Sequence, residues 1–209
     1  MIGDAIIRMT ITRGVGAPGI DPGLDNNHTT VIAPRLYQPF PPTCYSDGVS
    51  LAIVTIKRNP IESMPPSVKS LNFMNNILAK IEATRQCAFD AIMLNQHDHL
   101  TETTISNIFL VKNGQLYTPA VTCGILAGIT RDVVLSLAQK NRISSCQQVL
   151  TVEELYSADE FFLTNTSMEL MPVTQVDSRV IGQGRPGQMT AQLHNAFRKH
   201  VNLHLMETK

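Results

Sequence analysis

The first apolar stretch of the chain, residues 5–12 (AIIRMTIT), is β-branched and interrupted by single polar residues, a pattern typical of a β-strand. Similar short runs predict further strands at residues 31–33, 49–57, 91–94, 105–111, 161–164 and 172–176. Asn113-Gly114 is a dipeptide typical of a two-residue hairpin turn, so the chain is expected to fold back there into another strand.

Four other stretches place apolar residues three to four positions apart, which predicts helices. The longest covers residues 73–87, where Phe73, Met74, Ile77, Leu78 and Ile81 share helical spacing. The other three are predicted at residues 132–139, 153–158 and 190–201. Strands and helices mix without strict alternation and without an internal repeat, so the pattern indicates a mixed α/β protein.

Composition adds mainly exclusions. The 209 residues carry no net charge at neutral pH, so there is no electrostatic reason to expect nucleic acid or an anionic membrane as a partner. No apolar run approaches the roughly 20 residues that cross a bilayer, and residues 1–10 do not resemble a signal peptide. A cytoplasmic location is therefore expected.

Cysteine and histidine give no metal signature. The four cysteines form no C-x-x-C pair and have no zinc-ligand spacing to a histidine, so they are expected to be reduced thiols. His97 and His99 stand in NQHDHL, where a polar turn between strands is favoured over a metal site. We therefore expect no metal.

Several residues could carry chemistry, although each is weak alone. Lys69 lies between a turn-rich segment and a predicted helix, and such a lysine is usually solvated. Glu102 stands among small polar residues and could be a cap or part of a turn. The sequence GITRD, residues 128–132, opens a helix and could bind phosphate through free N–H groups, or Thr130 could be an ordinary N-cap. The polar cluster LTNTS at residues 163–167 could be a plain turn.

In combination these segments resemble the class IV aminotransferases, which include branched-chain aminotransferases, D-amino acid aminotransferases and aminodeoxychorismate lyases. The resemblance lies in VKSLNFMNNILAKIEA, LTETTISNIFLVKNGQLYTP, GILAGITRDVV, ADEFFLTNTSMELMPV and GQGRPGQMT, in the family's order and at similar spacing. It implies the mixed α/β fold of fold type IV. Residues 48–209 would be a C-terminal pseudo-barrel domain that binds pyridoxal 5'-phosphate, and residues 1–47 a remnant of a small N-terminal α/β domain with its linker. It also implies a homodimer.

The resemblance assigns roles residue by residue. Lys69 would form the Schiff base with the cofactor aldehyde and then move the substrate proton. Glu102 would face the pyridine nitrogen, and Leu126 would pack on the ring. The phosphate would be bound by Gly128, Ile129 and Thr130 at a helix start, together with Asn165 and Thr166.

The chemistry explains these residue types. A carboxylate keeps the ring nitrogen protonated, so that the ring can accept electrons when the substrate α-proton leaves. A lysine must lose its proton before it attacks an aldehyde, which requires partial desolvation or a cationic neighbour. Backbone N–H groups and hydroxyls at a helix start bind a phosphate dianion without a large basic patch, which suits a neutral chain.

The branch of the family is less determined by the sequence. Residues 69–72 (KSLN) resemble the D-amino acid branch, yet the loop GVGAPGIDPG at residues 14–23 lacks the basic residues that this branch uses to bind a carboxylate. An aminotransferase acting on an amino acid or amine is the first choice, and a lyase of the aminodeoxychorismate type is the alternative.

The family normally has a longer stretch before the strand at residues 5–12. The chain is therefore expected to be a fragment, a short subunit completed by a partner, or a non-catalytic binding protein that retains the fold.

Overall fold

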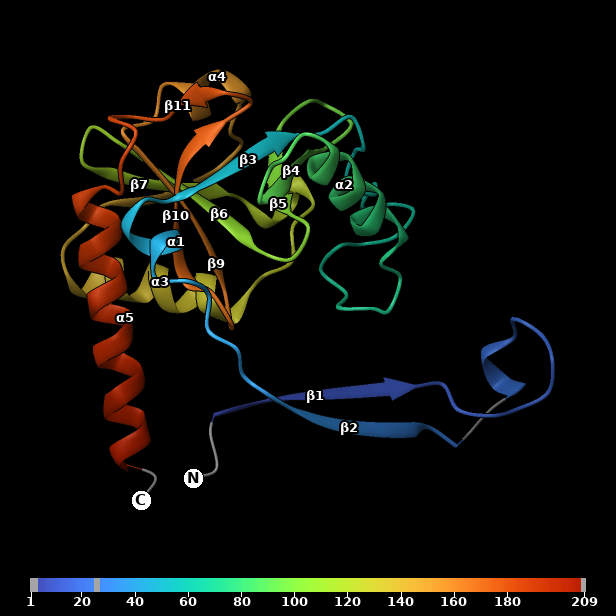
Figure 1. Cartoon of the computed structure of the whole chain (residues 1–209). Helices are drawn as coiled ribbons and strands as arrows, with labels where there is room; N and C mark the ends of the chain where they lie inside the picture. The colour runs from blue at the N-terminus through green and yellow to red at the C-terminus, as the bar shows by residue number, and fades with distance from the viewer. Residues whose placement is uncertain (1–3, 25–26, 208–209) are drawn as a thin grey trace. The chain divides into compact units, whose positions relative to one another are not determined.

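The computed structural model of the chain describes residues 4–24 and 27–207. Contacts divide the chain into two compact units, Met1–Pro39 and Phe40–Lys209. Figure 1 labels most helices and strands of both units.

The first unit is built around one β-hairpin. Its strands β1 (Ala5–Thr12) and β2 (Thr29–Leu36) pair antiparallel, with Met9 opposite Ile32, and a short 3-10 turn, η1 (Pro22–Leu24), lies in the connection. Directly opposite residues of an antiparallel pair point to the same face. Ile7, Met9 and Ile32 consequently form one apolar face, and all three are more than half exposed.

A nine-stranded mixed sheet forms the second unit. Along its main path the order is β5-β4-β3-β10-β9-β6-β7-β8, with β11 paired to β10, and the neighbours β4–β3, β3–β10 and β7–β8 run parallel. The strands are β3 (Val49–Ile53), β4 (Asp90–Leu94), β5 (Leu100–Thr103), β6 (Asn107–Lys112), β7 (Gln115–Pro119), β8 (Ser145–Gln148), β9 (Glu160–Asn165), β10 (Glu169–Val176) and β11 (Arg179–Val180).

Helices lie against this sheet in two places (Figure 1). α3 and α5 pack together on β6, β9 and β10, whereas α2 packs on β3 and β4. The helices are α1 (Thr43–Ser46), α2 (Met74–Arg85), α3 (Ile129–Lys140), α4 (Val152–Tyr156) and α5 (Gln188–Glu207), and η2 (Val121–Cys123) is a 3-10 turn. No helix in the described part of the chain is long and apolar enough to cross a membrane.

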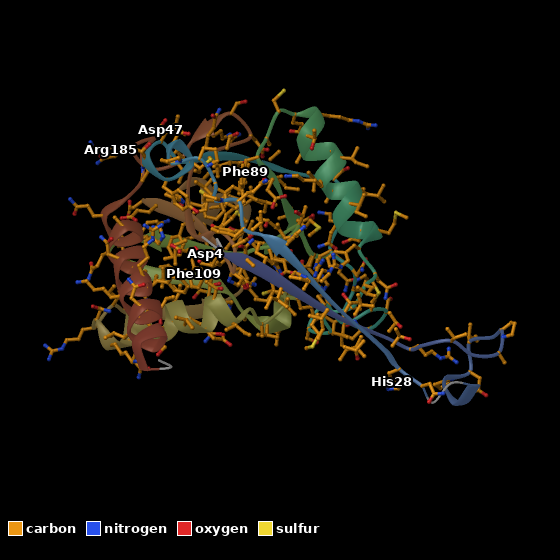
Figure 2. The ribbon with its side chains drawn as sticks, turned by 60° about the horizontal axis from the view of Figure 1, so that its bottom comes forward. Asp4, His28, Asp47, Phe89, Phe109 and Arg185 are labelled. Atoms are coloured by element: carbon orange, nitrogen blue, oxygen red, sulfur yellow. The ribbon has the colours of Figure 1, made fainter. Side chains whose placement is uncertain are left out.

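The core follows from the two-residue period of the strands. In β6, Ile108 and Leu110 join one apolar cluster, whereas Phe109 and Val111 join the cluster beneath α3 and α5. Phe109, labelled in Figure 2, stacks on Phe162 of the neighbouring strand β9 with ring centroids 5.1 Å apart. Both faces of the central strands are therefore buried, which explains why their sequences are apolar without interruption.

Several boundaries differ from those that the sequence predicts. The strand predicted at residues 49–57 ends at Ile53, whose N–H is bonded to the side chain of Asp177, and the chain then leaves the sheet. Strands β5 and β8 were not predicted, because LTET and SCQQ are largely polar and are strands only through pairing with neighbours. Helix α3 begins at Ile129 rather than at residue 132.

Candidate functional site

Lys69 lies in the turn-rich loop that precedes α2. The loop contains Pro65-Pro66 and is shaped by backbone bonds from Val68 N–H to Pro65 O (3.0 Å) and from Ser70 N–H to Val68 O (2.8 Å). Lys69 is exposed and lines a cleft in the second unit. The placement between a turn and a helix start agrees with the sequence prediction.

Glu102 lines the same cleft from β5. Its side chain is almost completely buried, with 5 % of the residue exposed. Leu126, from the segment before α3, is a third member of the lining. The structure therefore brings together Lys69, Glu102 and Leu126, which the sequence connects only through the family resemblance.

Three groups hold the Glu102 carboxylate. Arg58 Nη2 lies 2.5 Å from Oε1, and both side chains of this ion pair are nearly buried. The backbone N–H of Leu126 donates to Oε2 at 3.0 Å, and Asn107 Nδ2 donates to the same oxygen at 3.3 Å. Asn107 Nδ2 also donates to Leu126 O at 2.8 Å, so Glu102, Asn107 and Leu126 form one bonded group.

Burial and charge act against each other on this carboxylate. Desolvation raises the pKa of Glu102 to about 7, although the positive charges of Arg58, Lys69 and Arg131 and the N–H of Leu126 favour its ionised form. In the ligand-free chain the balance of these effects favours the protonated form more than it does for an exposed carboxyl group. A positive group placed against it would shift the balance towards the carboxylate.

Arg58 is a site residue that sequence reasoning missed. It follows β3, lines the cleft, and its Nη1 donates to Asn76 Oδ1 of α2 at 3.1 Å. In the sequence it stands in IKRNP, where nothing distinguishes it from a solvated arginine at the end of a strand. Glu102 reaches Arg58 only because β5 pairs with β4 in the folded sheet.

The start of α3 has no side-chain cap. Gly128 is the N-cap residue, in an extended conformation (φ −75°, ψ 136°), and Thr130 lies inside the helix rather than at its cap. Thr130 is buried and Ile129 is 82 % exposed. The alternative of an ordinary Thr130 N-cap is therefore wrong, and the first N–H groups of α3 lack a side-chain oxygen from the N-cap.

Gly128 is required there by packing. A Cβ at this position would lie 2.1 Å from Asn107 Oδ1, so a side chain could enter only if Asn107 moved. Asn107 is bonded to Glu102 and Leu126. The helix start is thus in contact with the group that surrounds the Glu102 carboxylate.

Asn165 is the last residue of β9, and Thr166 follows it in the turn towards β10. Asn165 Oδ1 accepts bonds from the N–H groups of Ser167 (2.9 Å) and Met168 (2.7 Å), which fixes the turn. Its Nδ2 donates to Ser106 Oγ at 2.9 Å, and Ser106 lines the cleft. Among the described residues, neither 128–130 nor 165–166 line the cleft. Gly128 contacts the lining residue Asn107, and Asn165 is bonded to the lining residue Ser106.

The two histidines lie in a polar turn, as predicted. Asn95 Oδ1 accepts bonds from the N–H groups of His97 and His99, and Asp98 has a positive φ of 59°. Within residues 4–24 and 27–207, no three His, Cys, Asp or Glu side chains gather in a way that could hold a metal ion.

Comparison with known proteins identifies the family. The family model "Amino-transferase class IV" matches residues 2–176. A putative branched-chain-amino-acid aminotransferase of Methanocaldococcus jannaschii is 42 % identical over 195 residues, which cover 93 % of this chain and 67 % of that protein. A D-alanine aminotransferase of Listeria innocua is 41 % identical over 134 residues, covering 64 % of this chain and 46 % of that protein.

The fold agrees with these matches. The branched-chain amino acid aminotransferase of Escherichia coli superposes with a TM-score of 0.88 at 32 % identity, and the match covers 93 % of this chain and 65 % of that one. Another branched-chain amino acid aminotransferase, solved with pyridoxamine 5'-phosphate, superposes with a TM-score of 0.89 at 29 % identity over the same share of this chain and 64 % of its own. The predicted fold class, the mixed α/β fold of type IV with its curled sheet, is confirmed, and the chain belongs to the class IV aminotransferase family.

Proposed function

We propose that this chain binds pyridoxal 5'-phosphate through Lys69 and provides the cofactor-binding part of an aminotransferase. The single observation that carries this proposal is the cleft that Lys69, Glu102 and Leu126 line together. An amine, a carboxylate and an apolar side chain on one cleft suit a flat ring with an aldehyde and a basic nitrogen. When bound, the cofactor supplies an electron sink that makes the α-proton of an amino acid acidic.

Lys69 would bind the cofactor aldehyde covalently and later carry the proton between carbon atoms. Its exposed position in a loop leaves its Nζ accessible to a ligand that enters the cleft. Arg58, 2.5 Å from Glu102 Oε1, favours the ionised carboxylate that a protonated ring nitrogen needs. Leu126 N–H and Asn107 would hold that carboxylate in one orientation.

The phosphate group would lie at the start of α3. The N–H groups of Ile129 and Thr130 and the positive end of the helix dipole attract an anion, and no N-cap side chain is bonded to these N–H groups. Asn165 and Thr166 would contribute from the neighbouring turn, which Asn165 joins to the cleft through Ser106. Residues 48–209 would thus form the cofactor domain, and residues 1–47 the rest of a small domain.

For the amino donor we propose an aliphatic branched-chain amino acid. The branched-chain relative and the branched-chain structures each match 93 % of this chain, whereas the D-alanine enzyme matches 64 %. The loop at residues 14–23 lacks the basic side chains that the D-amino acid branch uses to bind a carboxylate, which favours the branched-chain alternative.

The decisive experiment adds pyridoxal 5'-phosphate to the purified chain and follows the visible absorption band of the lysine-bound aldehyde. Borohydride reduction and peptide mass spectrometry should then place the tag on Lys69. Lys69→Ala should lose the band and the tag, and Lys140→Ala, an exposed lysine at the end of α3, should keep both. A tag that persists elsewhere in Lys69→Ala with an unchanged band would refute the assignment.

The donor is tested on the same preparation. L-leucine, L-isoleucine and L-valine should bleach the band and release the matching keto acids, and D-alanine should not. Release of a cleavage product in place of a keto acid would favour the lyase alternative. A band that responds to no donor would favour a binding protein.

We also propose that the chain forms a homodimer through α2. Met74, Ile77, Leu78 and Ile81 form an apolar stripe on the outer side of this helix and are 69, 52, 44 and 44 % exposed. Such a stripe usually marks an interface. Light scattering should show a dimer for the wild type and a monomer for Ile77→Glu, whereas Ile77→Leu, which keeps the apolar surface, should remain dimeric. A wild-type monomer at all concentrations would contradict the proposal.

A further inference from the structure

Arg131 is among the largest side chains that are fully buried in the chain, with only 2 % of the residue exposed. It is the third residue of α3, directly after Thr130. The structure thus places a permanent positive charge inside the first turn of the helix whose start we assign to the phosphate group.

The guanidinium is bonded to the sheet as well as to Asp132 of its own helix. Arg131 Nη2 donates to Pro119 O at 3.0 Å and to Gln147 Oε1 at 2.8 Å. Pro119 ends β7 and Gln147 belongs to β8, and these two strands pair in parallel. One side chain therefore connects the first turn of α3 to two strands.

A second contact holds the same turn from another direction. Gly128 packs against Asn107 Oδ1, and Asn107 is a residue of β6. The start of α3 is consequently fixed between β6 and the β7–β8 pair. A first turn without a side-chain cap would otherwise be the part of a helix that frays most easily.

The negative charges of Asp132 and Glu102 compensate that of Arg131 in part. Its carboxylate neighbour, Asp132, lies 3.3 Å from Nη1 but has a side chain that is 62 % exposed, and Nε has no hydrogen-bond partner within the described residues. A buried charge is costly unless it is paired, and an apolar residue of the same volume often fills such a position at lower cost. A buried cation at this point makes physical sense if an anion lies close to it.

We propose that Arg131 is a positioning residue for the cofactor phosphate. It holds the first turn of α3 against β7 and β8, so that the N–H groups of Ile129 and Thr130 converge on one point, and its buried charge stabilises the dianion there. This inference rests on the proposed function. It adds a residue that contacts the sheet and acts on the phosphate through the helix.

The test compares the affinities of two ligands that differ only in the phosphate group, pyridoxal 5'-phosphate and pyridoxal. They are titrated against the full chain carrying Arg131→Met, Arg131→Lys or Gln147→Ala, with Arg85→Met as the control for loss of an exposed helical arginine. Arg131→Met should weaken pyridoxal 5'-phosphate binding roughly tenfold or more, because it removes the buried charge and the bonds that hold the first turn of α3 to β7 and β8, and it should leave pyridoxal binding within about twofold. Arg131→Lys should lose less, because it keeps the charge, and Gln147→Ala should lose about threefold.

A purely structural role would give a different result. It would weaken both ligands equally, and that outcome in Arg131→Lys and Gln147→Ala overturns the inference even if Arg131→Met fails to fold. Unchanged binding of both ligands in these two variants also overturns it. If the wild-type chain binds neither ligand, the proposed function fails and the inference with it. If the wild type binds pyridoxal 5'-phosphate normally but the Arg131 and Gln147 variants keep its preference over pyridoxal, the inference fails and the proposed function stands.

Discussion

Helices α2 and α3 each contain twelve residues and each has apolar residues at helical spacing, yet they use those residues in opposite ways. In α3 the apolar residues Val134, Leu137 and Ala138 are buried against the sheet. In α2 the buried residues are Ala79 and Ala83, and the large side chains face outward. The outward stripe is the set of residues that made α2 easiest to predict.

The difference teaches that periodicity identifies a helix but not the face that it buries. Small residues allow α2 to lie close to β3 and β4, where Ala52 and Ala91 are also small. The outer stripe is then free for a partner, and the inner side of the helix positions Asn76 beside Arg58. α3 instead uses its large residues for the core, and its start contacts Asn107 of the cleft lining.

The largest expected contrast comes from the same truncation in both helices. Leu137→Ala in α3 removes a buried side chain and should lower the free energy of unfolding by about 2–5 kcal/mol. Leu78→Ala in α2 should change the unfolding free energy of the monomer by less than about 0.5 kcal/mol. Urea denaturation at low protein concentration measures both, and equal losses would contradict the assignment of the two faces.

A second prediction concerns pH, because the group around Glu102 connects with both helices. The pKa of Glu102 is raised to about 7 in the folded chain from an ordinary value of 4.5, so the folded chain keeps a proton that the unfolded chain has released. Stability should therefore fall as the pH rises from about 4.5 to 7, by on the order of 3 kcal/mol for this group.

Glu102→Gln should flatten that pH dependence in the ligand-free chain, because an amide has no proton to release in this range. Glu62→Gln, at an exposed glutamate, should leave the slope unchanged. Urea unfolding at pH 5 and pH 7 provides the comparison. The same slope in Glu102→Gln as in the wild type would show that the titrating group lies elsewhere.

A larger side chain should destabilise the protein more on the inner face of α2 than on its outer face. Ala79→Leu adds three carbons where the helix lies directly on β3 and β4, and it should cost about 1–3 kcal/mol. Thr84→Leu, on the exposed side of α2, should cost much less. Thermal unfolding of the two variants decides the point, and a neutral Ala79→Leu would mean that α2 is not tightly packed.

The smallest effect on stability is expected at the start of α3. Gly128→Ala introduces a methyl group that would displace Asn107. Because alanine also reduces the entropy of the unfolded chain, the net loss in the free energy of unfolding should be about 1 kcal/mol. Because Asn107 also holds Glu102 and Leu126, the loss of cofactor affinity should exceed the loss of stability. Ser136→Ala, on the exposed side of α3, is the matched control. A variant with full affinity would show that the Asn107 contact is not needed.

Much of the fold could be predicted from the sequence at strands that are buried on both faces and at turns whose residues favour positive φ. The apolar runs of β4, β6 and β9 mark central strands, and Asn113-Gly114 marks the β6–β7 turn, where both residues have positive φ. Polar strands such as β8 gave no signal. They exist because a neighbouring strand offers unpaired backbone groups, and that is a property of the assembled sheet.

By itself, the sequence determined the family and the mixed α/β class, because residue types and their order along the chain identify both. It also led to Lys69 and Glu102 as the proposed site residues. Only the tertiary structure decided that Arg58 pairs with Glu102, that Arg131 joins α3 to β7 and β8, and that α2 turns its apolar stripe outward. The physical reason is that burial and ion pairing depend on which distant segments meet. Local periodicity and propensity carry no information about those long-range contacts.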